Sequence, residues 1–241
     1  MDCIRSAACW TDGAAAGTEL PPITAIRLTD TCRLVPSLYP VAGILDTVST
    51  PDDLPYIFEL ESWTNDRIST ELGVLHRIPP SEWVVHRPMS SVIMAAFCHP
   101  RPGGGRFNGP DRGAWYAGMT LETAHAEVVY HRTAELAEVG VFETGVQMRL
   151  YLANFDTSFH DVRAEMPQNL PYHSPSSYTA SQALGRQLLE SGSNGVLYRS
   201  VRRPGSTCVA CFRPALVLDV RPDNHFEYRW EGKRKPGIRR L

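Results

Sequence analysis

A chain of 241 residues can bury a substantial hydrophobic core, and this length suits one domain, or one domain with a small extension. Its 43% hydrophobic and 21% charged residues are typical of a globular protein. The net charge of −2 gives no general reason to bind nucleic acid or an anionic membrane.

The expected compartment follows from the start of the chain and from the cysteines. The first twenty residues lack the continuous apolar core of a secretory signal, and the longest apolar run, SVIMAAFC at 91–98, is too short to cross a bilayer. The six cysteines are irregularly spaced and do not resemble the framework of a small secreted domain. We therefore expect a cytoplasmic, reduced protein.

The first third of the chain predicts two strands and a helical extension. Residues 1–22, rich in alanine and glycine, are expected to be a mobile segment. ITAIRL at 23–28 predicts a strand, and CRLVPSLYP at 32–40 predicts a strand followed by a turn. A helical extension is expected over about 51–73, where Asp52 or Asp53 forms an N-cap and Gly73 ends the second helical piece.

Residues 103–132, in the middle of the chain, predict a loop, a strand and a helix in succession. A glycine loop, Gly103 to Gly105, leads into Arg106, and a short strand is expected over Ala114 to Ala117. A helix follows from about Thr120 to Arg132, because threonine is a good N-cap residue. Its apolar stripe is formed by Leu121, Ala124 and Val128.

Strands and a helix alternate in the last third. VQMRLYLANF at 146–155 predicts a strand with one buried face, formed by Met148, Leu150 and Leu152. A helix over 177–192 would bury one side and end at Gly192; that side consists of Ala180, Ala183, Leu184, Gln187 and Leu188. A hairpin that turns at Pro204 and Gly205, a strand over 215–220 and a solvated basic tail complete a mixed α+β fold.

Two features of residues 103–132 could carry chemistry. The three glycines lack the spacing of a dinucleotide fingerprint and the lysine of a P-loop, so on their own they predict a surface turn. Arg106 favours phosphate binding, because its guanidinium fork suits phosphate oxygens. Glu127 adjoins the apolar stripe of its helix. It is either a structural partner of His131 or of an arginine, or a carboxylate held for catalysis.

Other polar motifs have plain structural interpretations. Cys208 and Cys211 form a CxxC pattern, but residues three apart on a strand point to opposite faces and cannot bind one metal ion together. We expect two core cysteines and no metal site. Ser200 ends a strand just before a turn, a position typical of a hydrogen-bonding turn residue. A serine or cysteine hydrolase is disfavoured, since the sequence has neither a nucleophile elbow nor a nucleophile–base pair.

Five segments together form one ordered pattern: CRLVPSLYP, MAAFCHPRPGGGRFNG, AWYAGMTLETAHAEVVYHR, SQALG and SNGVLYRSVRRPGSTCVACFRP. This pattern, which spans about residues 32–214, resembles the RES-domain family and in particular its ParT-type branch, toxins of bacterial toxin–antitoxin pairs. The resemblance implies an ADP-ribosyltransferase-like fold with a central sheet flanked by helices. It also implies a single RES-type domain over 23–241 with a catalytic core over about 95–220.

The resemblance implies a site built from strands, the glycine loop and one helix: Arg33, Arg106, Phe107, Tyr116, Glu127, His131 and Ser200. Arg33 matches the first arginine of the family pattern, for which Arg77 is an alternative. Glu127, Arg106 and Ser200 are expected to be catalytic, and all the site residues except Glu127 to contact the substrate. Phe107 stands where the family often has tryptophan.

The resemblance also implies the reaction and the partners. Family members cleave the nicotinamide–ribose bond of NAD⁺, which is the substrate, and need no metal. We expect transfer of ADP-ribose to a protein target; phosphorolysis or hydrolysis of NAD⁺ is the alternative. A cognate antitoxin protein is the expected partner, and no membrane or nucleic acid. A non-catalytic module that binds nucleic acid through the basic C-terminal stretch is a further alternative.

Overall fold

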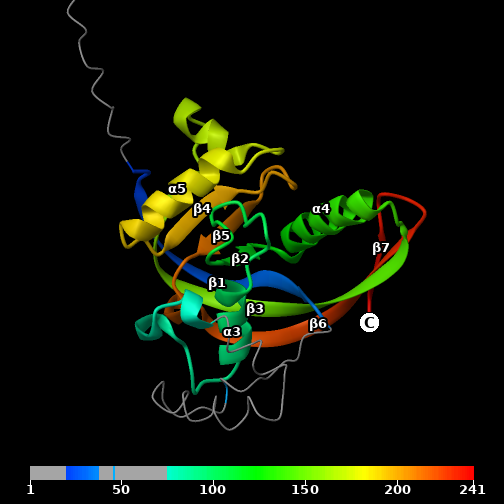
Figure 1. The fold of residues 1–241 in the computed structure, drawn as a ribbon, viewed down its shortest axis with the longest axis horizontal. Coiled ribbons are helices and arrows are strands. Elements are labelled where there is room, and N and C mark those ends of the chain that lie inside the picture. The colour runs from blue at the N-terminus through cyan, green and yellow to red at the C-terminus, as the bar shows by residue number, and fades with distance from the viewer. Residues whose placement is uncertain (1–19, 38–45, 47–74) are drawn as a thin grey trace, which may run out of the picture.

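The structure is a computed structural model that describes residues 20–37, 46 and 75–241 (Figure 1). The helical extension expected over 51–73 and residues 1–19 of the expected mobile segment lie outside the described residues. The last residues of that segment belong to the folded domain: Leu20 packs against a hydrophobic cluster, and the carbonyl of Pro22 accepts a hydrogen bond from the Asp161 N–H at 2.7 Å.

Strands and helices alternate along the chain, which confirms the mixed α+β expectation. The strands are β1 (Ile23–Pro36), β2 (Trp115–Gly118), β3 (Glu143–Asp161), β4 (Gly195–Arg199), β5 (Thr207–Cys211), β6 (Leu218–Glu231) and β7 (Gly237–Arg240). The α-helices are α3 (Ser90–Cys98), α4 (Leu121–Val139) and α5 (Thr179–Glu190). Short 3-10 helices are η3 (Leu75–Arg77), η4 (Pro80–Glu82), η5 (Pro167–His173) and η6 (Pro214–Leu216).

The strands form one seven-stranded sheet in the order β1-β2-β5-β4-β3-β6-β7. β1 also pairs with β3 over most of its length, so the strand order closes on itself at one end of the sheet. The β3–β4 pair is parallel and the other pairs are antiparallel. β1 and β2 meet through Cys32 and Gly118, which places the end of β2, just before α4, beside β1.

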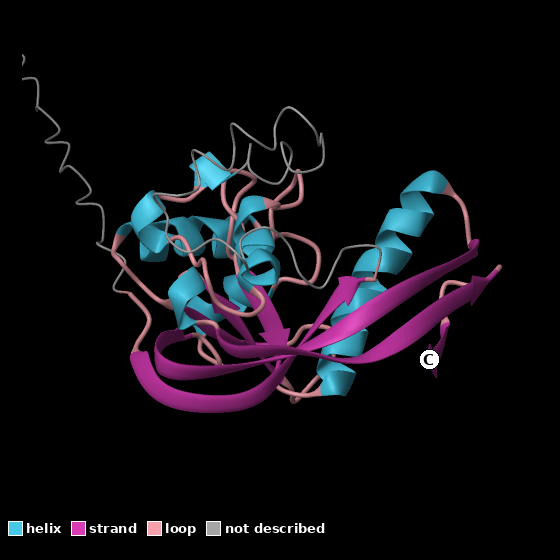
Figure 2. Cartoon of the chain, turned by 90° about the horizontal axis from the view of Figure 1, so that it is seen from below, coloured by secondary structure: helices cyan, strands magenta, loops and turns pink. Residues whose placement is uncertain are grey.

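Both faces of the sheet are covered at β3, whereas β7 at the edge is exposed along its length (Figures 1 and 2). One face of β3 shares a hydrophobic cluster with α3, and the other shares a cluster with α4 through Met148 and Leu150, as predicted. The prediction that this strand has a single buried face is wrong. Tyr151, expected to point toward solvent, is 2% exposed because the cluster that includes α3 covers it.

The helix predicted from Thr120 is confirmed and is longer than expected. The Thr120 hydroxyl accepts the N–H of Thr123, as an N-cap residue does, and α4 continues to Val139, where Gly140 takes the left-handed conformation. Ala124 lies in the cluster between α4 and the sheet, with Leu121 and Val128 packed against it. The predicted apolar stripe is therefore the face that α4 buries.

α5 confirms the predicted helix but not its buried side. Leu184 and Leu188 are buried as expected, whereas Ala183 and Gln187 are exposed. The remaining buried positions of α5 are Ser181 and Gly185. The face is rotated because Gly185 packs directly on the backbone of Phe107 in the glycine loop, a contact that hydrophobic periodicity does not reveal.

The hairpin predicted after α5 is confirmed as β4 and β5, and Gly205 in its turn has a positive φ of 76°. Cys208 and Cys211 lie on β5 and are both buried. They belong to different hydrophobic clusters on opposite faces of the sheet, as the strand geometry predicts.

The C-terminal region differs from the prediction. The strand expected over 215–220 begins as the 3-10 helix η6 and becomes a strand only from Leu218, and β6 then continues to Glu231. The basic stretch after residue 227 is not a solvated tail, because it forms the end of β6, a turn and β7. Tyr228 and Trp230 anchor this hairpin, since they are buried against α4.

Part of the basic charge in this hairpin is neutralised within it. Glu227 pairs with Arg229 at 2.9 Å and with Arg239 at 3.0 Å. This pairing reduces the charge on which a nucleic-acid-binding alternative would depend.

The contact between Gly185 and the glycine loop generates a stability prediction. A Cβ at this position would overlap the Phe107 carbonyl, so we expect Gly185→Ala to lower the free energy of unfolding by about 1–3 kcal/mol. At an unconstrained helical position the same change stabilises a protein by roughly 0.5–1 kcal/mol, so the sign is diagnostic. Urea denaturation measures it, with Gln187→Ala on the exposed side of α5 as control. A stabilised Gly185→Ala protein would contradict the prediction.

Candidate active site

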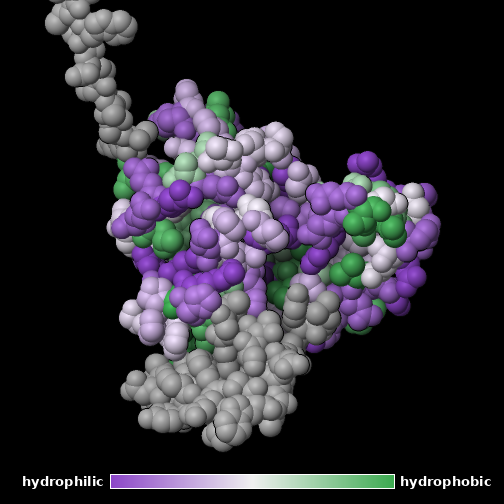
Figure 3. Space-filling model, in the orientation of Figure 1, coloured by the Kyte–Doolittle hydropathy of each residue, from purple (hydrophilic) through white to green (hydrophobic). Residues whose placement is uncertain are grey.

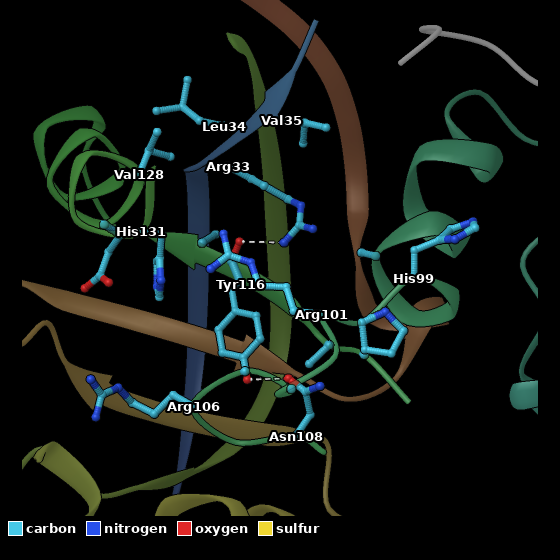
Figure 4. A pocket seen from close by; sticks show the side chains of 18 of the residues that line it. Arg33, Leu34, Val35, His99, Arg101, Arg106, Asn108, Tyr116, Val128 and His131 are labelled. Atoms are coloured by element: carbon cyan, nitrogen blue, oxygen red, sulfur yellow. Dashed lines mark hydrogen bonds between the residues drawn. The ribbon is translucent and has the colours of Figure 1, made fainter. Parts of the chain in front are cut away.

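A cavity of about 1330 Å³ lies between the glycine loop, β1 and α4. Figure 3 shows the surface hollowed between the part of the molecule that carries α5 and the part that carries α4. The cavity brings together five of the residues singled out in the sequence: Arg33, Arg106, Tyr116, Glu127 and His131. Figure 4 labels four of them, Arg33, Arg106, Tyr116 and His131, whose side chains are arranged around one space.

Hydrogen bonds from two other elements hold the glycine loop in place. The amide of Gln182 in α5 donates to the carbonyls of Gly103 and Gly105 at 2.9 and 3.0 Å. The Tyr116 hydroxyl donates to the Asn108 side chain at 2.7 Å and accepts a backbone N–H of the loop at 2.8 Å. A Cβ at Gly105 would overlap this hydroxyl, so the position requires glycine. The loop is a fixed wall of the cavity and not a simple surface turn.

Arg106 uses part of its hydrogen-bonding capacity within the protein. Its side chain is buried, and Nη1 donates to the carbonyls of Tyr172 and Ser174 at 3.2 and 2.9 Å. Its guanidinium carbon lies 4.6 Å from the ring centre of Tyr178, a cation–π contact. Arg106 therefore reaches the cavity and also anchors the segment that follows η5.

Residues 174–178 are called the entrance segment, because residues 175–178 line the cavity while Pro175 and its two following serines are exposed. The carbonyl of Pro175 accepts hydrogen bonds from Arg202 at 2.7 Å and from the Tyr130 hydroxyl at 3.4 Å. Arg106 holds the segment from the other side through Ser174. The entrance segment is thus tied to the glycine loop, to α4 and to the β4–β5 turn by bonds to its backbone.

Arg33 projects from β1 into the same space. Its Nη1 donates to the carbonyl of Tyr116 at 3.1 Å, and its guanidinium carbon lies 4.8 Å from the ring centre of Trp115. Its Nε is buried without a hydrogen-bond partner among the described residues. Burial lowers the pKa of Arg33 to about 10, so the group stays charged at neutral pH. A buried charge with an unused donor is suited to an anionic ligand.

Glu127 is held by Ser200. The Ser200 hydroxyl donates to Glu127 Oε1 at 2.7 Å and accepts the N–H groups of Arg202 and Arg203 at 3.2 and 3.1 Å. These accepted bonds orient the hydroxyl so that its proton points at the carboxylate. Within the described part of the chain Glu127 forms no ion pair with His131 or with an arginine, so the structural pair is not found there. Ser200 is itself 5% exposed and supports Glu127 from the protein interior.

His131 is a neutral group in a positively charged space. Burial lowers its pKa to about 3, and the charges of Arg101, Arg202, Arg106 and Arg132 contribute further in that order. The imidazole is therefore uncharged at physiological pH. The same shift indicates that several guanidinium groups act on one point of the cavity wall.

Two residues expected at the site lie elsewhere. Phe107 is 1% exposed and packs against Tyr198 with the ring centres 5.0 Å apart, so it does not form an aromatic wall of the cavity. Its side chain supports the loop from inside because it follows Arg106 and points the opposite way, toward α5. Arg77, the alternative to Arg33, is exposed and donates to the carbonyl of Pro110 at 3.4 Å, away from the cavity lining.

Sequence reasoning missed the residues that hold the site together. Gln182 belongs to the SQALG segment, but its double contact with the glycine loop has no signature at 77 and 79 residues of separation. Arg101 lines the cavity and precedes the glycines by two positions. Its place between Pro100 and Pro102 was the available signal, since two prolines restrict the backbone around it.

No described group of three or more histidine, cysteine, aspartate or glutamate side chains is arranged to hold a metal ion. The helices of the described residues are also too short or too polar to cross a membrane.

Comparison with known proteins gives three findings. A family model described as "RES domain" matches residues 74–231, a range that contains Arg106, Glu127 and Ser200 and that Arg33 precedes. The uncharacterized protein y4oC of Sinorhizobium fredii is 28% identical over 204 residues, which cover 84% of this chain and 83% of the relative. A chain in the crystal structure of the M. tuberculosis MbcT–MbcA toxin–antitoxin complex aligns with a TM-score of 0.44 and 14% identity, over 85% of this chain and 87% of that chain.

The lowered pKa of His131 predicts a pH dependence of stability. In the unfolded chain this histidine takes up a proton near its ordinary pKa of 6.5, whereas in the folded protein it does so only near 3. The free energy of unfolding therefore falls as the pH drops below 6.5, by up to about 2 kcal/mol at pH 5 from this residue. Urea denaturation at pH 7.5 and pH 5 should show a smaller loss for His131→Gln than for the wild type. Equal losses in the two proteins would refute the assignment.

Proposed function

The chain belongs to the RES domain family, and on this premise we propose that it is an enzyme that breaks the nicotinamide–ribose bond of NAD⁺. One observation carries the proposal: a carboxylate, Glu127, receives a hydrogen bond of 2.7 Å from Ser200 at the wall of a cavity lined by guanidinium groups. Such a site combines two properties that cleavage of NAD⁺ requires. The guanidinium groups can bind the diphosphate, and the fixed carboxylate can stabilise the positive charge that develops on the ribose.

The size and charge of the cavity support a dinucleotide substrate. A volume of about 1330 Å³ exceeds the roughly 300–1,000 Å³ of pockets that hold drug-sized ligands, so an extended dinucleotide has room. The diphosphate carries two negative charges, which Arg33 and Arg106 complement with the donors that they do not spend on backbone carbonyls. Tyr116 borders the same space and its ring is the candidate platform for nicotinamide.

Glu127 is the proposed catalytic residue. When the bond between ribose C1′ and the nicotinamide nitrogen breaks, the electron pair leaves with nicotinamide and neutralises its ring, and the ribose becomes oxocarbenium-like. A carboxylate whose Oε1 is already fixed by Ser200 presents Oε2 to a ribose hydroxyl and stabilises the developing positive charge. Ser200 is proposed to orient Glu127, because its accepted bonds leave it no role as a nucleophile.

The acceptor of ADP-ribose completes the reaction. We propose transfer to a protein target, in which an acceptor group bonds to C1′ and releases its proton; phosphorolysis or hydrolysis of NAD⁺ is the alternative. The entrance segment is compatible with a large acceptor, because its exposed residues form part of the cavity rim where a second molecule would approach. The three outcomes share the first bond cleavage and differ in what attacks the ribose.

The role of Glu127 can be tested with an isosteric variant. Glu127→Gln keeps the shape and an acceptor oxygen but removes the charge, so we expect NAD⁺ consumption to fall by at least about a hundredfold, as losses of single electrostatic stabilisers do. The melting temperature should stay near that of the wild type. Glu138→Gln, on the exposed side of α4, is the matched control. Full activity of Glu127→Gln would rule out the proposed mechanism.

Labelled NAD⁺ separates the acceptors in the same assay. Label on a protein band in cell lysate supports transfer, ADP-ribose 1″-phosphate formed only with phosphate supports phosphorolysis, and free ADP-ribose supports hydrolysis. The absence of label on any protein would favour one of the alternatives over transfer.

An enzyme that consumes NAD⁺ in its own cytoplasm would harm its cell, so we propose a toxin restrained by a cognate antitoxin that covers the cavity. Co-expression with the antitoxin should yield one complex in gel filtration, with NAD⁺ consumption suppressed. In the complex, the entrance segment should become protected from proteolysis because it forms the cavity rim. Two separately eluting proteins, or an unchanged rate of NAD⁺ loss, would contradict this proposal.

A further inference from the structure

We propose that Arg101 is a third substrate-binding guanidinium group, which exchanges its contact with Glu135 for the diphosphate of the bound dinucleotide. The inference rests on the proposed function for the identity of the anion. It adds a residue that neither the sequence pattern nor the family match assigns. Its basis is the position of Arg101 at the base of the glycine loop, the geometry of its contact and the donors available around the cavity.

The backbone places Arg101 firmly at the cavity. It lies between Pro100 and Pro102, and the ring of a following proline restricts the preceding residue to extended conformations. Its carbonyl accepts the N–H of Gly104 at 2.8 Å, which closes a turn with Pro102 at a position that proline favours. The turn that begins the glycine loop therefore fixes the origin of the Arg101 side chain. Figure 4 shows this side chain among those of Tyr116, Arg33 and His131.

The contact that Arg101 makes is easily exchanged. Its Nη2 lies 3.4 Å from Glu135 Oε1, and the two side chains are 48% and 42% exposed. Exposed ion pairs of this kind contribute little to stability. Glu135 also pairs with Arg132, one turn back on α4, at the shorter distance of 2.7 Å. Glu135 would therefore keep a partner if Arg101 moved to a ligand.

Arg33 and Arg106 each have part of the guanidinium group committed to the protein. Arg106 spends Nη1 on two carbonyls, and Arg33 spends Nη1 on one. Arg101 and Arg132 are the cavity-lining arginines whose side chains form no hydrogen bond to a backbone carbonyl within the described residues. Arg132 lies 2.7 Å from Glu135, whereas Arg101 lies 3.4 Å from the same carboxylate, so the Arg101 fork is the more readily available of the two.

The positive charge of Arg101 acts on other groups that line the cavity. It contributes, after burial, to the lowered pKa of both Arg33 and His131. A bound anion would relieve the repulsion among these groups, so the three arginines favour the same ligand. The exchange from Glu135 to phosphate then replaces an exposed contact with a charge-assisted one inside the cavity.

Binding of ADP-ribose, measured by isothermal titration calorimetry, tests the inference without catalysis. Removal of one charge-assisted contact predicts that Arg101→Gln weakens binding about tenfold. Glu135→Gln frees Arg101 and should tighten binding about two- to threefold. The double variant should match Arg101→Gln. Arg27→Gln, which breaks an exposed arginine–carboxylate pair outside the cavity, is the matched control. Melting temperatures establish that each variant folds, and Arg101→Lys serves if Arg101→Gln does not.

The outcomes are distinguishable. If Arg101 has only a structural tie to Glu135, the two single variants lose affinity alike, and the inference is overturned. Unchanged affinity in Arg101→Gln overturns it as well. If the wild-type protein neither binds ADP-ribose nor consumes NAD⁺, the proposed function fails and this inference fails with it. Weaker binding in Arg101→Gln together with tighter binding in Glu135→Gln supports both.

Discussion

The Ser200 hydroxyl is the contact on which the geometry of the site depends. It joins the turn after β4 to the middle of α4, because it accepts two N–H groups of the turn and donates to the Glu127 carboxylate. Without this donor, the carboxylate would have no partner among the described residues and could turn toward the surrounding arginines. The hydrogen bond thus keeps a negative charge apart from positive groups that would otherwise neutralise it.

Two arginines of the cavity, Arg33 and Arg106, likewise form no ion pair with a carboxylate of the described residues. Arg33 and Arg106 donate to backbone carbonyls, which are dipoles and leave the full positive charge in place. Mutual repulsion and burial make such an arrangement costly, as the lowered pKa values of Arg33 and His131 indicate. A bound anion would offset part of the free energy that this burial and repulsion cost. The arrangement is therefore suited to a negatively charged ligand.

The sequence predicted the parts of this site that depend on local pattern. The Thr120 cap, the apolar stripe of α4 and the β4–β5 hairpin follow from capping, periodicity and turn residues, and all three are confirmed. The Ser200–Glu127 bond spans 73 residues, and no local pattern encodes it. The rotated face of α5 and the inward side chain of Phe107 were missed for a related reason. Both follow from the close approach of two backbones at Gly185, which depends on the assembled fold.

The anchoring of the entrance segment has a consequence for sequence divergence. Arg106, Arg202 and Tyr130 hold it through the carbonyls of Ser174 and Pro175, groups that every amino acid possesses. A substitution at Ser176, whose side chain takes no part in these bonds, can therefore alter the chemistry of the cavity entrance without removing its backbone anchors. Ser177 is less free to vary, because its hydroxyl bonds to Thr179 at the start of α5. Relatives could therefore differ in which molecules reach the cavity while the residues of its interior stay the same.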